Sequence, residues 1–116
     1  MLMGTELSDV PPTCSQPGRD FRQNYENWAC PRVLSNVKNH GHCDILSPLG
    51  WEMCRLINAC TTKPDADLNR YHMFLQGYTS AFYGYYVQGN VDMLKYVTDQ
   101  NMIPIEFIEF KTDVHC

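Results

Sequence analysis

The sequence has no C-x-x-C pair, no long apolar run and no excess of positive charge. Without C-x-x-C, it lacks both the thioredoxin-type redox motif and the usual zinc-ribbon motif. No apolar run approaches the ~20 residues that a transmembrane helix needs, so we predict no membrane span. The net charge of −4 disfavours contact with phosphate backbones, which argues against nucleic acid as the partner.

Catalytic signatures are missing as well. The chain contains no Gly-rich phosphate loop, no G-x-S-x-G elbow and no H-E-x-x-H helix motif. The residues therefore give no support for an enzyme, and we expect neither catalytic residues nor a cofactor.

Cysteine is what the chain does have, with six in 116 residues. An even number of cysteines in a short chain is typical of disulfide-stabilised proteins from oxidising compartments. We therefore predict a periplasmic or secreted protein. The opening residues 1–6 lack the basic and apolar regions of a signal peptide, so we expect the leader to be absent from this sequence. All six cysteines are disulfide candidates: Cys14, Cys30, Cys43, Cys54, Cys60 and Cys116.

Helix geometry constrains the pairing of these cysteines. Cys54 and Cys60 are six residues apart on one predicted helix, which separates their Cα atoms by ~9 Å along the axis. A disulfide spans at most ~7 Å between Cα atoms, so we predict that these two are not joined. The helix should instead be bridged to other elements: to the first helical region through Cys30 or Cys43, and to Cys14 or Cys116.

The hydrophobic pattern predicts helices throughout. Residues 1–18 hold three prolines and no periodicity, which indicates an irregular N-terminal arm before a single helical domain, 19–116. Asp20 is a plausible N-cap for a first helix. Its apolar stripe continues past Pro31, where the helix either kinks or a second helix begins. The stripe consists of Phe21, Tyr25, Trp28, Val33, Leu34 and Val37.

Further helices are predicted along the rest of the chain. Ser47-Pro48 is typical of a helix start, and a stripe follows it. A long helix is expected over 65–87 and a short one after Asn90. For 103–110 we favour a helix over a strand, because no other segment offers a strand partner. The predicted fold is all-α, a small disulfide-stapled orthogonal bundle of four to five helices. The Ser47 stripe consists of Leu49, Met53, Leu56, Ile57 and Cys60.

The C-terminal half carries the features expected of a protein-binding surface. Residues 65–116 hold seven of the thirteen acids but three of the nine bases, which suits a basic protein partner. The long helix is rich in tyrosine, a residue favoured at interfaces. We expect its outward members to contact the partner together with acids of this half. The candidate contact residues are Tyr83, Tyr86, Asp92, Glu106 and Glu109.

A metal site is a weaker alternative. His40, His42 and Cys43 are the densest group of zinc or copper donors in the sequence. Their spacing matches no established motif, and a His-Gly-His turn is also an ordinary helix-ending loop. The primary prediction is therefore that the chain has no metal.

Three segments resemble small periplasmic helical families. Asn24-Tyr-Glu-Asn-Trp-Ala-Cys-Pro-Arg-Val-Leu34 resembles the opening helix of Tai-type immunity proteins, which neutralise cell-wall amidases delivered by type VI secretion. Gln76-Gly-Tyr-Thr-Ser-Ala81 is similar to a helix of Rap-type immunity proteins and of HdeA/HdeB-like periplasmic proteins. Met102-Ile-Pro104 resembles the start of the last Rap-type helix, with Met102 where those proteins have cysteine. The resemblance implies an exported, all-α, disulfide-bonded protein that binds another protein.

Three functional hypotheses follow. The first is a periplasmic immunity protein or inhibitor that binds and blocks a cognate toxin, an envelope-degrading or other effector enzyme. The second is an acid-stress periplasmic chaperone of the HdeA/HdeB kind, for which a homodimer is expected. The third is a secreted cysteine-rich effector or small metal-binding protein.

Overall fold

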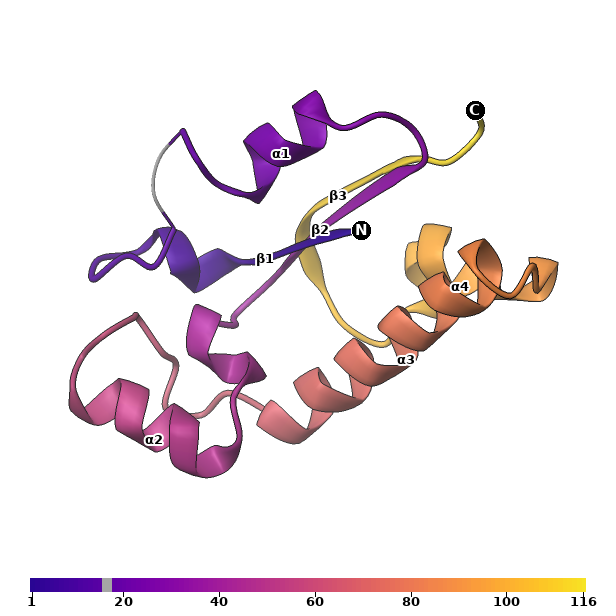
Figure 1. Ribbon diagram of the computed structural model, residues 1–116. Helices are drawn as coiled ribbons and strands as arrows, with labels where there is room; N and C mark the ends of the chain where they lie inside the picture. The colour runs from indigo at the N-terminus through magenta and orange to yellow at the C-terminus, as the bar shows by residue number, and fades with distance from the viewer. Residues whose placement is uncertain (16–17) are drawn as a thin grey trace.

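The protein has an α+β fold, so the prediction of an all-α bundle is wrong. The computed structural model describes residues 1–15 and 18–116, and within them it has four α-helices and a three-stranded sheet (Figure 1). In chain order the elements are β1 (Leu2–Thr5), η1 (Glu6–Asp9), α1 (Phe21–Asn27), β2 (Arg32–Val37), η2 (His42–Ile45), α2 (Pro48–Leu56), α3 (Leu68–Tyr86), η3 (Val91–Met93), α4 (Lys95–Thr98), η4 (Gln100–Met102) and β3 (Phe107–Asp113), where η denotes a 3₁₀ helix.

The central strand β2 was predicted as helical, either as the kinked continuation of the first helix or as a second helix, and this prediction is wrong. It pairs parallel with β1 and antiparallel with β3. Val33, Leu34 and Val37 are fully buried, because both faces of this strand are covered. A strand buried on both faces does not alternate between apolar and polar residues. Its spacing therefore also fits a helical stripe, which explains the error.

The last strand, β3, was predicted as a helix over 103–110. Its partner is β2, with Leu34 opposite Lys111 and Ser35 opposite Phe110. The argument against a strand was the lack of a partner, and that argument fails because β2 had itself been taken for a helix. Phe107–Phe110, the second part of the Ile-Glu-Phe-Ile-Glu-Phe sequence, lie in β3 as their strand propensity favours.

Part of the N-terminal segment 1–18 is also in the sheet. Leu2–Thr5 form β1, with Leu2 opposite Leu34 and Thr5 opposite Val37. The expectation of a wholly irregular arm is therefore wrong at these residues, while Pro17 lies outside the described ones. The division into an arm, 1–18, and a domain, 19–116, stays a prediction.

The helix starts agree with the sequence. The Asp20 carboxylate accepts hydrogen bonds from the backbone N–H groups of Arg22 and Gln23 at the start of α1. Ser47 caps α2 and Pro48 is its first residue. The long helix is confirmed as α3, where Asp67 caps the N-terminus. These signals are local, so they do not depend on the tertiary fold.

The main core lies between the sheet and α3, while α1 covers the other side of the sheet (Figure 1). A second, smaller cluster lies beneath α2 and consists of buried Cys43, Trp51 and Cys60, with Cys54 and Leu68 packed against it. No described helix is both long enough and apolar enough to cross a membrane. The buried residues of the main core are Val33, Val37, Tyr71, Phe74, Tyr78, Ala81, Val97 and Ile103.

Candidate functional site

The apolar stripe of α2 faces solvent. Leu49, Leu56 and Ile57 are 75%, 71% and 68% exposed, respectively. The predicted stripe also included Cys60, which is wrong, because Cys60 is buried and lies beyond the end of α2. No other part of the described structure covers the exposed face. Two exposed residues that precede the helix extend the same kind of surface. We call the set the α2 apolar face: Ile45, Leu46, Leu49, Met53, Leu56 and Ile57.

A buried carboxylate fixes the opposite side of α2. Asp44 in η2 is fully buried. Its Oδ1 accepts a hydrogen bond of 2.8 Å from Trp51 Nε1, and its Oδ2 accepts one of 3.1 Å from the backbone N–H of Gly41. His40 Nδ1 lies 2.7 Å from Oδ2, and because a carboxylate oxygen only accepts, this nitrogen donates. Asp44 thus ties α2 to the segment before it.

The same segment is anchored to α3. His72 Nε2 lies 2.7 Å from the backbone carbonyl of Asp44 and donates to it. The His40 ring stacks on Tyr71, with ring centroids 4.5 Å apart. Burial, followed by the nearby Asp44 charge, raises the pKa of Tyr71, so its phenol stays neutral. Through these contacts α2 has a fixed position against the main core.

Disulfides add covalent links to this region. The structure pairs all six cysteines as Cys14–Cys60, Cys30–Cys116 and Cys43–Cys54. The prediction that Cys54 and Cys60 are not joined is confirmed, although its stated reason was wrong. The helix ends at Leu56, so Cys60 is not on it. Two of the three bridges hold α2 and the segment that follows it.

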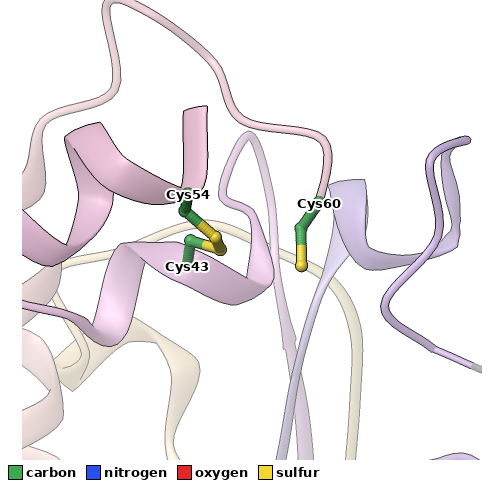
Figure 2. A group of neighbouring side chains, drawn as sticks. All are labelled: Cys43, Cys54 and Cys60. Carbon is green, nitrogen blue, oxygen red and sulfur yellow. A yellow bond between two sulfur atoms is a disulfide. The ribbon is translucent and has the colours of Figure 1, made fainter. Parts of the chain in front are cut away.

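Three sulfur atoms, two from one bridge and one from another, lie close together beneath α2. Figure 2 shows the Cys43–Cys54 disulfide between η2 and α2, with Cys60 beside it. The Sγ atoms of Cys43, Cys54 and Cys60 all lie within 4.8 Å of one another. His40 and His42, the other donors of the predicted metal group, do not belong to this cluster. His40 forms a hydrogen bond with Asp44. His42 is exposed and lines a hollow beside β1.

The predicted contact residues are not all in one place. Tyr83 is 53% exposed near the end of α3, and Asp92 is exposed in η3. Tyr86 is partly buried, and its hydroxyl has no hydrogen-bond partner among the described residues. Glu106 and Glu109 belong instead to the β3 side of the molecule. Whether any of the five contacts a partner stays a prediction.

The two glutamates have ion-pair partners within the chain. Glu106 pairs with Lys38 at 2.9 Å. Glu109 lies between Arg22, at 2.9 Å, and Lys111, at 3.1 Å. Partial burial alone would raise the pKa of Glu109, but hydrogen bonds from Lys111 and Arg22 outweigh it and hold this pKa below the ordinary value. These acids therefore offer less free charge to a basic partner than the sequence suggested.

A second apolar surface was missed by the sequence analysis. It is a hollow of about 260 Å³ between α3 and the segments after it. Gly77 opens it, because a Cβ added there would meet nothing within 4 Å. Exposed Met73 and Met102 lie at its surface. The sequence feature that could have indicated this hollow is the recurrence of methionines around a small residue. Flexible thioethers suit adaptable binding surfaces. The lining residues are Met73, Phe74, Gly77, Tyr78, Ser80, Ala81, Met93, Tyr96, Met102, Ile103 and Pro104.

Comparison with known proteins adds no family assignment. No protein-family model, no curated protein and no solved structure matches this chain.

Proposed function

We propose that this protein is an exported inhibitor of the immunity-protein type, which binds a toxin enzyme through the α2 apolar face and blocks it. The single observation that carries the proposal is the exposure of that face. Monomeric soluble proteins rarely leave a contiguous apolar surface of this kind uncovered unless it binds something. Burying one leucine or isoleucine side chain contributes about 1.5–3 kcal/mol, so a few of the six side chains would supply useful affinity.

The way α2 is held supports a binding role. Its inner side is fixed by Asp44 and by the Cys43–Cys54 bridge, and the segment after it by Cys14–Cys60. An element that is already ordered loses little conformational entropy on binding, and such preorganisation strengthens association. In Figure 1, α2 lies at the periphery of the molecule, where a partner's cleft can receive it.

The three disulfides support export. Disulfides form and persist in the periplasm and outside the cell, and they are rare in the reducing cytosol. A toxin that degrades the cell envelope acts in that same compartment. The location and the class of target are therefore consistent with each other.

The test is complex formation with the product of the neighbouring gene, followed by an envelope-hydrolysis assay. The wild-type protein should form a complex, inhibit the enzyme and rescue cells that produce it. The double variant Leu49→Lys/Leu56→Lys should lose binding and inhibition. Val91→Lys is the matched control, because Val91 is also 75% exposed but lies in η3, outside the α2 apolar face. Absence of a complex together with absence of rescue would refute the toxin-inhibitor role.

An HdeA/HdeB-like chaperone is the second candidate, and the same exposed face favours it. In that case a second copy of the chain covers the face at neutral pH and leaves it in acid, where the face binds unfolding clients. Sedimentation at neutral pH and at about pH 3 separates the candidates. A dimer that dissociates in acid and suppresses client aggregation supports the chaperone. A monomer at both pH values, without such activity, eliminates it.

A further inference from the structure

The sulfur cluster beneath α2 has the composition of a zinc centre. Cys43, Cys54 and Cys60 have Sγ atoms within 4.8 Å of one another (Figure 2). Cys14 is bonded to Cys60. Four thiolates are a common ligand set for structural zinc. In a tetrahedral site with Zn–S bonds of ≈ 2.3 Å, the sulfurs are separated by roughly 3.8 Å. Cys60 Sγ lies within 4.8 Å of the bonded Cys43–Cys54 pair, and Cys14 is brought to the same place by its bond to Cys60.

We propose that the reduced protein binds one Zn²⁺ through the thiolates of Cys14, Cys43, Cys54 and Cys60. The four cysteines thus specify two exclusive states of the same region, one with two disulfides and one with a zinc centre. This inference does not depend on the proposed function, because it concerns the inner side of α2 and not its apolar face.

The backbone positions suit both states. The Cα atoms of Cys43 and Cys54 are 6.4 Å apart, and those of Cys14 and Cys60 are 5.5 Å apart. When a disulfide is reduced, its two sulfurs need to separate by only ~2 Å to reach zinc-site spacing, and rotation about the Cα–Cβ bonds provides such a shift. Within each pair, the backbone positions seen in the oxidised protein are therefore compatible with zinc ligation.

The surroundings also suit structural zinc. Cys43 and Cys60 are 2% and 5% exposed, and they pack with Trp51 and Leu68. On the side of Cys43 and Cys60 an apolar shell limits solvent access to the metal, while Cys14 is exposed and forms the outer side of the site. This second core is small, so the region needs a covalent or metal link for stability in either state.

Reduction of the two disulfides precedes zinc binding. Two equivalents of an external dithiol reduce the Cys43–Cys54 and Cys14–Cys60 bonds, and each dithiol becomes a disulfide while it delivers two electrons and two protons. The product carries four thiols. Zn²⁺ then forms four Zn–S bonds as the four thiol protons pass to solvent, because only the thiolate is a zinc ligand.

Cobalt is the direct probe of this centre. The full chain is reduced with a phosphine, freed of reductant without air and titrated with Co²⁺. We expect one equivalent to bind with the charge-transfer and visible bands of a tetrahedral thiolate site, and Zn²⁺ to abolish those bands. The oxidised protein should bind none. Reduced protein that binds no Co²⁺, or oxidised protein that binds it equally well, overturns the proposal.

Two variants locate the site. Cys54→Ser should lose the tetrathiolate spectrum, whereas the matched control Cys30→Ser/Cys116→Ser, which lacks the third disulfide, should retain it. A second readout covers the case in which Cys54→Ser fails to fold: Zn²⁺ should raise the melting temperature of the reduced wild-type protein and of the control. No zinc-dependent rise in the wild type, or loss of the spectrum in the control, contradicts the assignment.

Discussion

Replacing Asp44 with asparagine tests how α2 is held in place. The side chain keeps its shape, but one carboxylate oxygen becomes an NH₂ group that only donates. With the amide oxygen at the Oδ2 position, Trp51 Nε1–H faces a donor and loses its acceptor. In the flipped orientation Gly41 and His40 lose theirs. At least one buried donor is therefore left without a partner in either orientation.

The size of the effect follows from these contacts. A hydrogen bond to a charged group contributes about 1.5–3 kcal/mol, and an unsatisfied buried donor costs about 1–3 kcal/mol. Removing the buried charge lowers the desolvation cost and offsets part of this loss. We expect Asp44→Asn to reduce the free energy of unfolding by about 2–4 kcal/mol. With a urea m-value of about 1–3 kcal/mol/M, the midpoint moves down by roughly 0.7–4 M.

Urea unfolding followed by tryptophan fluorescence measures this directly. The chain has two tryptophans, and Trp28 is half exposed, so a Trp28→Phe background leaves Trp51 as the reporter beside Asp44. The matched control is Asp92→Asn, the same chemical change at an exposed position, which should stay within about 0.5 kcal/mol of wild type. A loss below about 1 kcal/mol for Asp44→Asn, or an equal loss for Asp92→Asn, would refute the role given to Asp44.

Three further perturbations are informative. Gly77→Ala should raise the free energy of unfolding by about 0.5–1 kcal/mol, because alanine favours the helix and its Cβ meets no atom; a lower melting temperature in calorimetry would contradict an open surface there. Removal of the Cys30–Cys116 bridge, whose cysteines are 86 residues apart, should cost roughly 4–5 kcal/mol in urea unfolding by the chain-entropy relation, and a cost below ~2 kcal/mol would contradict this estimate. The pKa of Glu109 is lowered from 4.5 in the folded protein, so its stabilisation is complete above pH 4.5 and is lost as the pH falls through the folded value. Glu109→Gln should therefore be less stable at neutral pH and lose less stability on acidification, and unfolding curves with the same pH dependence as wild type would count against the Arg22 pair.

The features predicted correctly are those set by neighbouring residues. The caps of α1 and α2, at Asp20 and Ser47, depend on side chains within three residues of the helix start. The sheet depends on residues far apart in the chain. Leu34 lies between Leu2 and Lys111, and no local pattern in residues 32–37 identifies either partner. One misassigned central strand was enough to remove the reason for expecting β3.

The candidate site was likewise predicted only in part from the sequence. The sequence indicated which side chains of α2 share a face, because that follows from the helical repeat. It did not indicate which face would be covered, because this depends on where η2 and Cys60 lie in space. The choice of Tyr83 and Tyr86 was made from residue type alone. Composition favours tyrosine at interfaces, but it carries no information on which side of α3 faces the sheet.

The orientation of α2 determines which of its side chains are buried and which are exposed. At 100° per residue, Trp51 lies about 160° from both Leu49 and Met53 around the helix axis, and Cys54 lies about 140° from Leu49. Hydrophobic burial alone would turn the side with Leu49 inward, because it carries more apolar area. The Cys43–Cys54 bridge and the Trp51–Asp44 hydrogen bond hold the other side inward instead. The bridge and the hydrogen bond thus keep an apolar face of α2 on the outside of the described structure, where it is accessible to another surface.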